Sequence, residues 1–379
     1  MAKCYLCGCE LTNENESLEH IVPNALGGKL KSKALLCKKC NNNTGNLEEH
    51  LCNSLVFFIS ALEVKRERGK IPTIRKETES GRIIFLDAGL KPRIQTEFKF
   101  KNGYINLSAP NEEKAKQIIL GLKKKYPKID MEKILYGMEV SERYLDEGVG
   151  FNISLNEFSL RAIVKSILNY ALINNISIHN QGEYVDYING KNDDVLLKMY
   201  NAASPYTYKE DIISLVAIIK SKELHKIVGY LQFFGFYKFY LVLDNDYNGD
   251  NEHIEYIFYS DGNKEDINFD ISSFENEFYV IGDIEKLKED LSLILNKIMN
   301  LIGKKEVGRL IGKAIDEMQE KFPKEENPII TDEMINFLSF AVADKIAKFY
   351  ISQKKIGIVG SIPIINKYEL CKKRETPLN

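Results

Sequence analysis

The sequence lacks any apolar run long enough to cross a membrane. A transmembrane helix needs about 18 or more apolar residues, whereas the apolar stretch at residues 54–62 is much shorter and is followed by charged residues. The N-terminus also lacks the basic and then apolar plan of a signal peptide. From these absences we expect a cytoplasmic protein with no membrane partner.

A strong net charge is absent as well. The formal net charge of −2 excludes a uniformly basic protein that binds nucleic acid through its whole surface. The charge is uneven, because residues 1–76 contain 12 Lys and Arg against 8 Asp and Glu, and the remainder contains 40 against 46. The mildly basic first part is compatible with a surface that faces DNA, although a surplus of this size is also common by chance.

Cysteine is almost absent from most of the chain. Only Cys371 lies beyond residue 52, and the other six cysteines lie within the first 52 residues. An even distribution would suggest disulfides, whereas clustered CxxC pairs suggest a bound metal. The hydrophobic fraction of 44% and the length of 379 residues allow two or three folded domains.

Two CxxC pairs predict a structural zinc site. Zinc prefers four soft or borderline ligands in a tetrahedron, and each CxxC pair holds two sulfurs on one side of a tight turn. Cys9 competes with Cys7 as a ligand, but the CxxC spacing favours Cys7. Cys52 lies in a predicted helix, where we expect a small buried residue. The predicted zinc ligands are Cys4, Cys7, Cys37 and Cys40.

A carboxylate, an imidazole and an amide lie close to these cysteines. Glu19 and His20 are adjacent between the two pairs, and Asn41 follows the last cysteine. Carboxylate and amide oxygens suit Mg²⁺, which can neutralise charge on a phosphodiester during hydrolysis. Imidazole can accept a proton from the attacking water near neutral pH. Adjacent residues of a regular strand point to opposite faces, so we predict a twist or bulge at Glu19–His20.

The order Leu-Glu-His-Ile-Val-Pro, Leu-Gly-Gly, Leu-Leu-Cys-x-x-Cys-Asn resembles the HNH, or ββα-metal, endonuclease family. It is most similar to the zinc-stapled branch of the phage T4 endonuclease VII type, over residues 4 to about 50. The resemblance implies that His20 is the general base and that Glu19 and Asn41 hold a catalytic Mg²⁺ or Mn²⁺. Many members have an asparagine that orients the base where this chain has Ser32, so the orientation of the base is the part in doubt.

The remaining chain predicts an α+β fold. We expect a small zinc-bound ββα-metal module with its covering helix at residues 1–62 and a charged linker at 63–81. An α+β body at 82–379 follows, with mixed strands in the middle and helices at the end, and with a further division near 265–285 as one option. Its role would be recognition, regulation or dimerisation.

Periodicity locates several elements of this body. Apolar residues at helical spacing predict a helix over 156–174, with Lys165 at the edge of the stripe as a lysine that snorkels to solvent. Strands are expected around 227–243 and 253–260, and helices over 284–302, 307–322 and 331–352. Two further features are a hairpin that turns at Asn102–Gly103 and a helix over 110–125.

Residues 244–255 satisfy the pattern of an EF-hand calcium loop. The flanking sequences are typical of strands rather than helices, so we interpret this stretch as a polar turn. Basic residues around the cysteines could contact phosphates or serve solubility; they are Lys29, Lys31, Lys33, Lys38 and Lys39.

These features predict a metal-dependent DNA endonuclease that nicks DNA, or cuts both strands as a homodimer, with RNA as the less favoured substrate. By analogy it would act in restriction or anti-phage defence. One alternative is a zinc-finger-like regulator that binds nucleic acid without cutting it. Another is an HNH effector that is switched on by a small ligand bound to the body.

Overall fold

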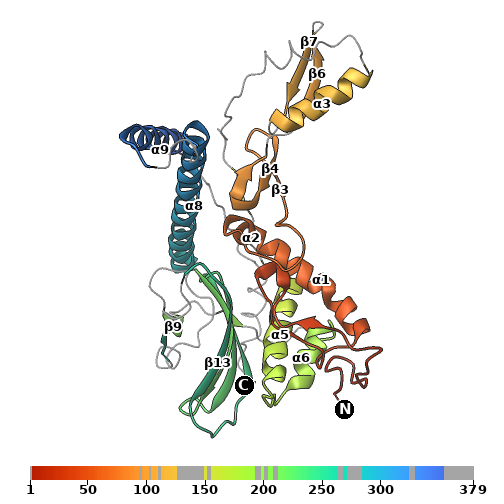
Figure 1. Ribbon diagram of the computed structural model, residues 1–379. Helices are drawn as coiled ribbons and strands as arrows, with labels where there is room; N and C mark the ends of the chain where they lie inside the picture. Colours follow the sequence, from red (N-terminus) through yellow and green to blue (C-terminus); the bar gives the residue numbers. More distant parts are fainter. Residues whose placement is uncertain are drawn as a thin grey trace. The chain divides into compact units, whose positions relative to one another are not determined.

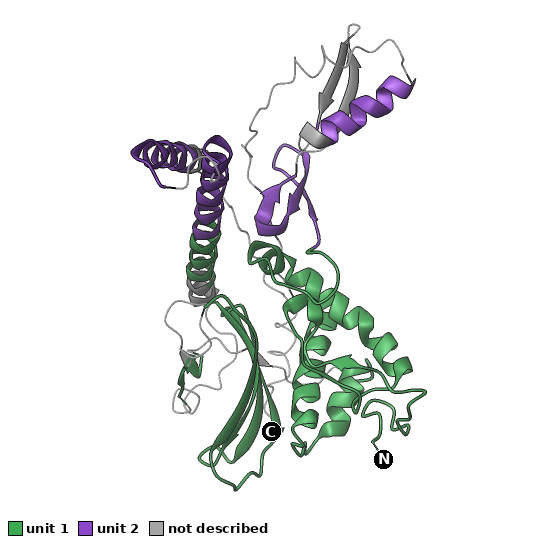
Figure 2. Cartoon of the chain, in the orientation of Figure 1, with its two compact units in different colours: residues 1–71, 152–303, 362–379 green, residues 72–151, 304–361 purple. Residues whose placement is uncertain are grey.

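The α+β class is confirmed by the fold, which combines long helices with antiparallel sheets (Figure 1). The chain forms two compact units, one of residues 1–71, 152–303 and 362–379 and the other of residues 72–151 and 304–361 (Figure 2). The computed structural model describes residues 2–93, 96–101, 104–109, 112–125, 149–151, 155–192, 198–199, 204–207, 212–262, 268–270, 284–323 and 329–353.

The N-terminal segment, residues 2–62, is a short hairpin followed by two helices. The two strands pair antiparallel, and a 3-10 turn lies between them. The elements in chain order are β1 (Glu19–His20), η1 (Asn24–Leu26), β2 (Lys31–Ser32), α1 (Lys38–Ser54) and α2 (Val56–Ala61). The segment therefore has the strand–strand–helix order that the sequence predicted.

Helix α1 begins nine residues before Leu47, where the apolar periodicity starts. Cys37 is its N-cap, and the sulfur of Cys37 accepts a hydrogen bond from the backbone N–H of Cys40 at 3.5 Å. The first turns carry cysteine and asparagine rather than apolar residues, so periodicity alone could not find them. The covering helix expected within residues 1–62 is divided in two, because Leu55 separates α1 from α2.

A five-stranded antiparallel sheet forms the centre of the first unit, in the order β13-β10-β11-β12-β8. A separate pair of short strands, β9 and β14, lies in the same unit. The strands are β8 (Lys198–Met199), β9 (Tyr206–Thr207), β10 (Ile213–Ser221), β11 (Lys226–Phe233), β12 (Tyr237–Asp244), β13 (Glu252–Ser260) and β14 (Asn268–Phe269).

Two details of this sheet differ from the sequence prediction. The single strand expected over 227–243 is a hairpin, because Phe234 and Gly235 both have positive φ, at 52° and 73°. A turn of this kind matches the twist of the strands that it joins. Strand β10 was not predicted, because nearly all its side chains are buried and the sequence does not alternate.

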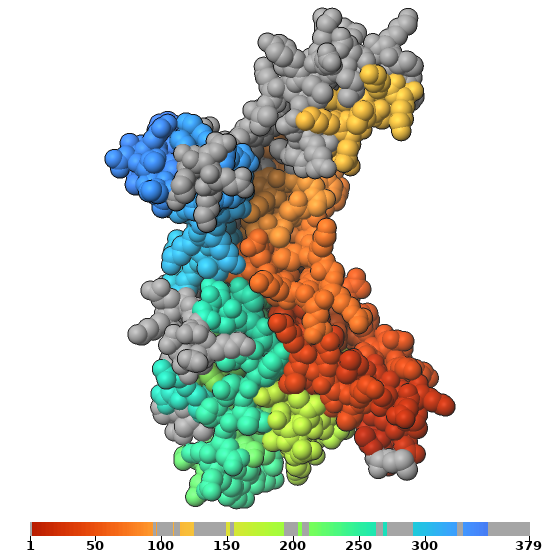
Figure 3. Space-filling view, in the orientation of Figure 1, coloured from red at the N-terminus to blue at the C-terminus, as the bar shows by residue number. Residues whose placement is uncertain are grey.

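Helix α5 (Glu157–Ile173) packs between α1 and the sheet, against β10, β11 and β12 (Figure 1). This confirms the helix predicted over 156–174, and the Asn156 side chain caps it by accepting the Ser159 N–H at 2.9 Å. Gly229 of β11 permits the close approach, since a Cβ there would lie 2.2 Å from Cγ2 of Ile167. Figure 3 shows the N-terminal residues in red beside the yellow-green residues of α5 and the following helix α6 (Gln181–Ile188).

The second unit contains the remaining strands and most of the C-terminal helices. Strands β3, β4 and β5 form one sheet, and β6 and β7 form the predicted hairpin, whose turn residues 102 and 103 lie outside the described residues. The elements are β3 (Ile74–Glu77), β4 (Ile83–Asp87), η2 (Ala88–Leu90), β5 (Lys91–Pro92), β6 (Glu97–Lys101), β7 (Tyr104–Ser108), α3 (Glu112–Lys125) and α9 (Asp332–Gln353).

Helix α8 (Ile284–Lys321) contributes residues to both units. The break predicted between 302 and 307 is wrong, because one glycine, Gly303, costs a helix only about 1 kcal/mol and does not stop it. Strand β3 begins inside the 63–81 stretch, and residues 263–267 and 271–283 lie outside the described part of the chain. The domain boundaries inferred from sequence therefore stay predictions. None of the described helices has the length and apolarity needed to cross a membrane.

Candidate active site

Five thiols gather at the start of the chain. The sulfurs of Cys4, Cys7, Cys9 and Cys37 all lie within 4.8 Å of one another, and the backbone N–H of Cys40 donates to the sulfur of Cys37 at 3.5 Å. Zinc takes four ligands in a structural site, so this donor set fits the ion with one sulfur to spare. The compact group of four sulfurs contains Cys9 where the sequence predicted Cys40, so the choice of Cys40 as the fourth ligand stays a prediction.

The backbone lowers the pKa of two of these thiols toward the thiolate form, which is the form that binds zinc, whereas burial raises the pKa of Cys4 and of Cys40. A hydrogen bond from the backbone of Cys9 lowers the pKa of Cys7 to about 6. Burial acts to raise the pKa of Cys37, but hydrogen bonds from the backbone and thiol of Cys40 lower it overall. By contrast, burial raises the pKa of Cys52 to about 12. Cys52 is therefore an unreactive thiol outside the cluster.

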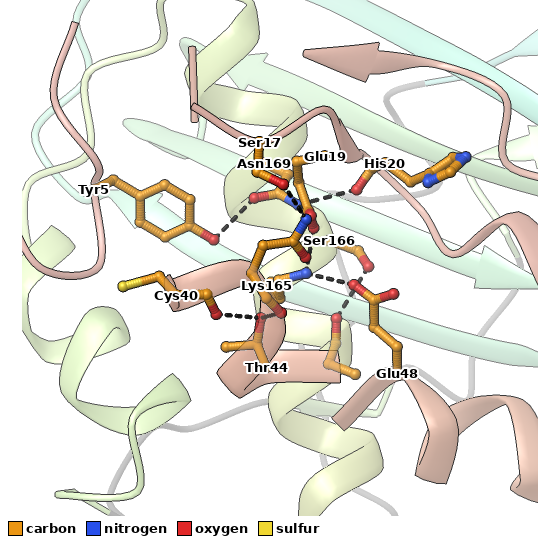
Figure 4. A network of polar contacts seen from close by, with 12 residues as sticks. Tyr5, Ser17, Glu19, His20, Cys40, Thr44, Glu48, Lys165, Ser166 and Asn169 are labelled. Carbon is orange, nitrogen blue, oxygen red and sulfur yellow. Dashed lines mark hydrogen bonds and ion pairs between the residues drawn. The ribbon is translucent and has the colours of Figure 1, made fainter. Parts of the chain in front are cut away.

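The hairpin places Glu19 and His20 on opposite faces of β1. Glu19 pairs with Ser32 and His20 with Lys31, and the register runs without a shift. The side chain of Glu19 faces the interior and its residue is only 2% exposed, whereas the His20 ring points away from it (Figure 4). The predicted twist or bulge at this step is therefore wrong, and the ordinary alternation of a strand is kept.

The Glu19 carboxylate binds two side chains of helix α5. Its Oε1 forms an ion pair with Nζ of Lys165 and accepts a hydrogen bond from Nδ2 of Asn169 at 3.3 Å (Figure 4). Lys165 also pairs with Glu48 of α1. The predicted snorkelling of Lys165 is wrong, because this edge of α5 faces the N-terminal segment and the lysine side chain is only 1% exposed.

Charge and burial have opposite effects on the pKa values of Glu19 and Lys165. Burial raises the pKa of Glu19, and the ammonium of Lys165 acts against that rise. Burial by itself would lower the pKa of Lys165, but the carboxylates of Glu48 and Glu19 raise it overall. The lysine therefore stays charged between the partly exposed Glu48 and Glu19, which would otherwise be buried without a counter-charge.

Asn169 contacts both residues of β1. Its Nδ2 donates to Oε1 of Glu19 and to the backbone oxygen of His20, each at 3.3 Å. Its Oδ1 accepts a hydrogen bond from the hydroxyl of Tyr5 at 2.8 Å, which fixes the orientation of the amide. The sequence analysis missed Tyr5 and Asn169, because neither belongs to a motif and they lie 164 positions apart.

The His20 ring lies beside Glu67. Nε2 of His20 is buried without a hydrogen-bond partner among the described residues, and it lies 3.5 Å from Oε2 of Glu67. Lys31 binds the same carboxylate and lowers its pKa. Ser32 does not orient the ring, because its Oγ accepts the backbone N–H of Ala34 instead. Glu67 is thus the acidic group that the structure places next to the predicted base.

Asn41 lies in the first turn of α1. Its Nδ2 donates to Oγ of Ser17 at 2.5 Å, which ties it to the chain two residues before Glu19. Within the described part of the chain, Oδ1 of Asn41 and Oε2 of Glu19 have no hydrogen-bond partner. Two hard oxygens of this kind fit Mg²⁺ or Mn²⁺. The structure records no direct contact between Glu19, His20 and Asn41, so their assembly around one cation stays a prediction.

The loop of the hairpin is held by strand β13. The hydroxyl of Tyr256 accepts the backbone N–H of Lys29 at 2.7 Å and that of Leu30 at 3.0 Å. Gly27 has a φ of 97°, and a Cβ at this position would lie 2.8 Å from the backbone oxygen of Phe258. The N-terminal segment is therefore packed against the sheet at its loop and against α5 at β1.

The basic side chains around the segment divide into two groups. Lys33 pairs with Glu16 at 2.5 Å, Lys31 pairs with Glu67, and Nζ of Lys38 donates to a backbone oxygen at 2.6 Å. Lys29 and Lys39 are exposed and have no ion-pair partner among the described residues. These two lysines are available to contact an anionic ligand.

His50 and the calcium-like stretch at residues 244–255 both have surroundings that suit a structural role. Nδ1 of His50 lies 3.0 Å from Nδ2 of Asn156, and its ring stacks on Phe158. The calcium-like stretch is a turn between β12 and β13, as predicted. Asp244 and Asp246 of this turn lie within 4.8 Å of His179, but the group is largely exposed, and exposed groups of this kind are common without a bound ion.

Residues 4–55 match the family model described as HNH endonuclease. The match confirms the resemblance that the motifs indicated, and it places an HNH endonuclease domain on the hairpin and α1. It covers a minor part of the chain and leaves α5 and the sheet outside. Searches of curated proteins and of solved structures found no significant match.

Proposed function

We propose that the protein is a metal-dependent HNH endonuclease that hydrolyses DNA phosphodiester bonds. The observation that carries the proposal is the position of His20. It lies on the hairpin of the matched residues, half-buried, with its Nε2 3.5 Å from Oε2 of Glu67. An imidazole whose Nε2 faces a carboxylate can accept a proton from water on its other nitrogen, Nδ1.

Each predicted residue has one task in this reaction. His20 takes the proton from the attacking water, and Glu67 stabilises the imidazolium that results. Glu19 and Asn41 offer carboxylate and amide oxygens to Mg²⁺ or Mn²⁺, and the bound cation supplies neutralisation of the charge on the phosphate. The zinc-bound thiols keep the hairpin and the first turn of α1 together, because a segment this small needs a staple.

The substrate is proposed to be DNA, with RNA as the weaker alternative. Lys29 and Lys39 are the exposed cations nearest in sequence to the hairpin and to Asn41, and they would contact phosphates beside the scissile bond. One site cuts one strand, so cleavage of both strands requires a homodimer. Restriction or anti-phage defence in the cytoplasm is the biological setting that this activity fits.

Nicking of supercoiled plasmid in the presence of Mg²⁺ or Mn²⁺ tests the proposal. We expect the wild-type protein to form open-circular product and EDTA to stop it. The His20→Ala variant should lose about 10²- to 10⁴-fold in rate, the contribution of a general base, while it keeps its affinity for the plasmid. His50→Gln is the matched control, because that histidine binds Asn156 on the flank of α1.

Other outcomes distinguish the alternatives. Plasmid binding without nicking, in both wild type and His20→Ala, would replace the enzyme by a zinc-finger-like regulator. Nicking that appears only after a small nucleotide or cell extract is added would favour a ligand-gated effector. Faster cleavage of RNA than of DNA would change the substrate class. Linear product from a protein that sediments only as a monomer would rule out the dimer.

A further inference from the structure

We infer that Asn169, which lies outside the matched family residues, is a positioning residue that holds Glu19 and His20 in one arrangement. The inference rests on the proposed function, because it assigns Glu19 to a divalent cation and His20 to proton transfer. Asn169 belongs to α5, and its side chain is 1% exposed. It touches neither substrate nor cation, so it acts through the two residues that it binds.

The hydrogen bonds of Asn169 reach two different atoms of β1. One hydrogen of the amide goes to Oε1 of Glu19, and the other goes to the backbone oxygen of His20, both at 3.3 Å. Strand β1 has only two residues and one neighbouring strand. Its free edge is therefore fixed by this side chain, which couples the carboxylate of Glu19 to the backbone that carries the His20 ring.

The hydrogen bond and the ion pair of Glu19 use only one of its two carboxylate oxygens. Lys165 and Asn169 both bind Oε1, so Oε2 is the oxygen with no hydrogen-bond partner in the described part of the chain. A carboxylate ligand is commonly oriented in this way, with one oxygen held by a neighbour and the other on the metal. Oε2 would therefore be the oxygen of Glu19 that is available to a cation.

The amide of Asn169 has only one orientation that satisfies its partners. The backbone oxygen of His20 can only accept a hydrogen bond, so Nδ2 must face it. The hydroxyl of Tyr5 then donates to Oδ1 at 2.8 Å. Tyr5 lies within the N-terminal segment, next to Cys4, so the thiol cluster and the acidic site are joined through Tyr5 and Asn169 (Figure 4).

Binding of Mn²⁺, followed by EPR on the zinc-loaded full chain, tests this role together with plasmid nicking at saturating Mn²⁺. Asn169→Leu keeps the branched shape of the side chain and removes both hydrogen-bond donors. We expect it to weaken Mn²⁺ binding by about 10- to 100-fold, the range for residues that orient a metal ligand, and to slow nicking. Tyr5→Phe, which leaves the amide but frees it to turn, should act in the same direction with a smaller loss.

The matched control is Ser166→Ala on the same helix. Ser166 is also buried, but its hydroxyl donates to the backbone oxygen of Ala162 within α5. We expect this variant to bind Mn²⁺ and to nick DNA like the wild type. Zinc content and circular dichroism establish that each variant is folded, and Tyr5→Phe keeps the test decisive if Asn169→Leu does not fold.

The outcomes separate this inference from the proposed function. If the wild type binds Mn²⁺ and nicks DNA, and folded Asn169→Leu does both equally well, the positioning role is overturned while the endonuclease stands. If Ser166→Ala loses as much as Asn169→Leu, general damage to α5 explains the loss and the role is again overturned. If the wild type neither binds Mn²⁺ nor nicks, both proposals fall.

Discussion

The N-terminal segment contains two sites that are built in different ways. They are the cysteine cluster, called the thiol end, and the surroundings of Glu19, called the acidic end. At the thiol end, every candidate ligand lies between Cys4 and Cys40, so the cluster closes within the segment itself. At the acidic end, Glu19 is held by Lys165, which lies 146 positions further along the chain. The difference shows that the residues of a family motif can form one cluster among themselves, while another of them depends on partners far along the chain.

The thiol end should give the largest effect, because a bound zinc ion would tie the hairpin to the start of α1. Cys37→Ser removes a thiol common to both ligand sets, while the serine hydroxyl can still cap α1. Structural zinc contributes about 10–16 kcal/mol to comparable small domains. We expect zinc loss, partial unfolding and no nicking, as measured by metal analysis and circular dichroism. Cys52→Ser is the control, and a zinc-free Cys37→Ser protein with unchanged spectrum would contradict the account.

The fourth zinc ligand can be decided by a second pair of cysteine variants. Cys40→Ser should lower zinc affinity strongly, whereas Cys9→Ser should leave nearly stoichiometric zinc, because the CxxC spacing favours Cys40. A competition titration with a zinc chelator measures both. The reverse order would make Cys9 the ligand, since its sulfur also lies within 4.8 Å of the other three.

The acidic end should respond most to loss of its counter-charge. Lys165→Met leaves Glu19 and Glu48 facing each other without a cation, and breaking a buried ion pair costs about 3–5 kcal/mol. Urea unfolding measures the loss. The same substitution at Lys191, whose pair with Asp186 is exposed, should cost no more than about 1 kcal/mol. Equal losses at the two sites would show that the buried pair has no special role.

Tyr5→Phe tests the contact that joins the two ends. It removes one hydroxyl and leaves Oδ1 of Asn169 without its donor, so we expect a loss of about 1–3 kcal/mol in the free energy of unfolding. Tyr247→Phe is the matched control, because that hydroxyl binds a backbone oxygen at an exposed turn. A loss no larger than in the control would mean that the two ends are independent.

The smallest effect is expected at the surface of the thiol end. Lys33→Ala breaks an exposed pair with Glu16, and such pairs contribute about 0–1 kcal/mol. Thermal unfolding should therefore change little. A loss of several kcal/mol would show that this pair belongs to the structural core of the segment.

Features determined by neighbouring residues were the ones that the sequence could predict. The gathering of cysteines near the N-terminus and the hairpin at β6–β7 each follow from short-range chemistry that is written in a few consecutive residues. The long apolar stripe of α5 predicted the helix for the same reason. These elements are confirmed with nearly the expected bounds.

Features determined by tertiary packing could not be predicted. Lys165 looked like a surface lysine, because periodicity shows which face of a helix is apolar but not which element packs there. Asn169 and Tyr5 meet only after α5 packs beside the hairpin. The predicted irregularity at Glu19–His20 failed because it assumed that both side chains face one site, whereas α5 supplies partners on the inner face of a regular strand.

A double-mutant cycle between Glu19→Gln and Lys165→Met tests the central claim most directly, namely that the acidic residue of the N-terminal segment is held by α5. The measured quantity is the free energy of unfolding in urea for the wild type, both single variants and the double variant. Contacting residues couple by about 0.5–3 kcal/mol, so the double variant should be more stable than the sum of the single losses predicts. Losses that simply add would contradict the claim.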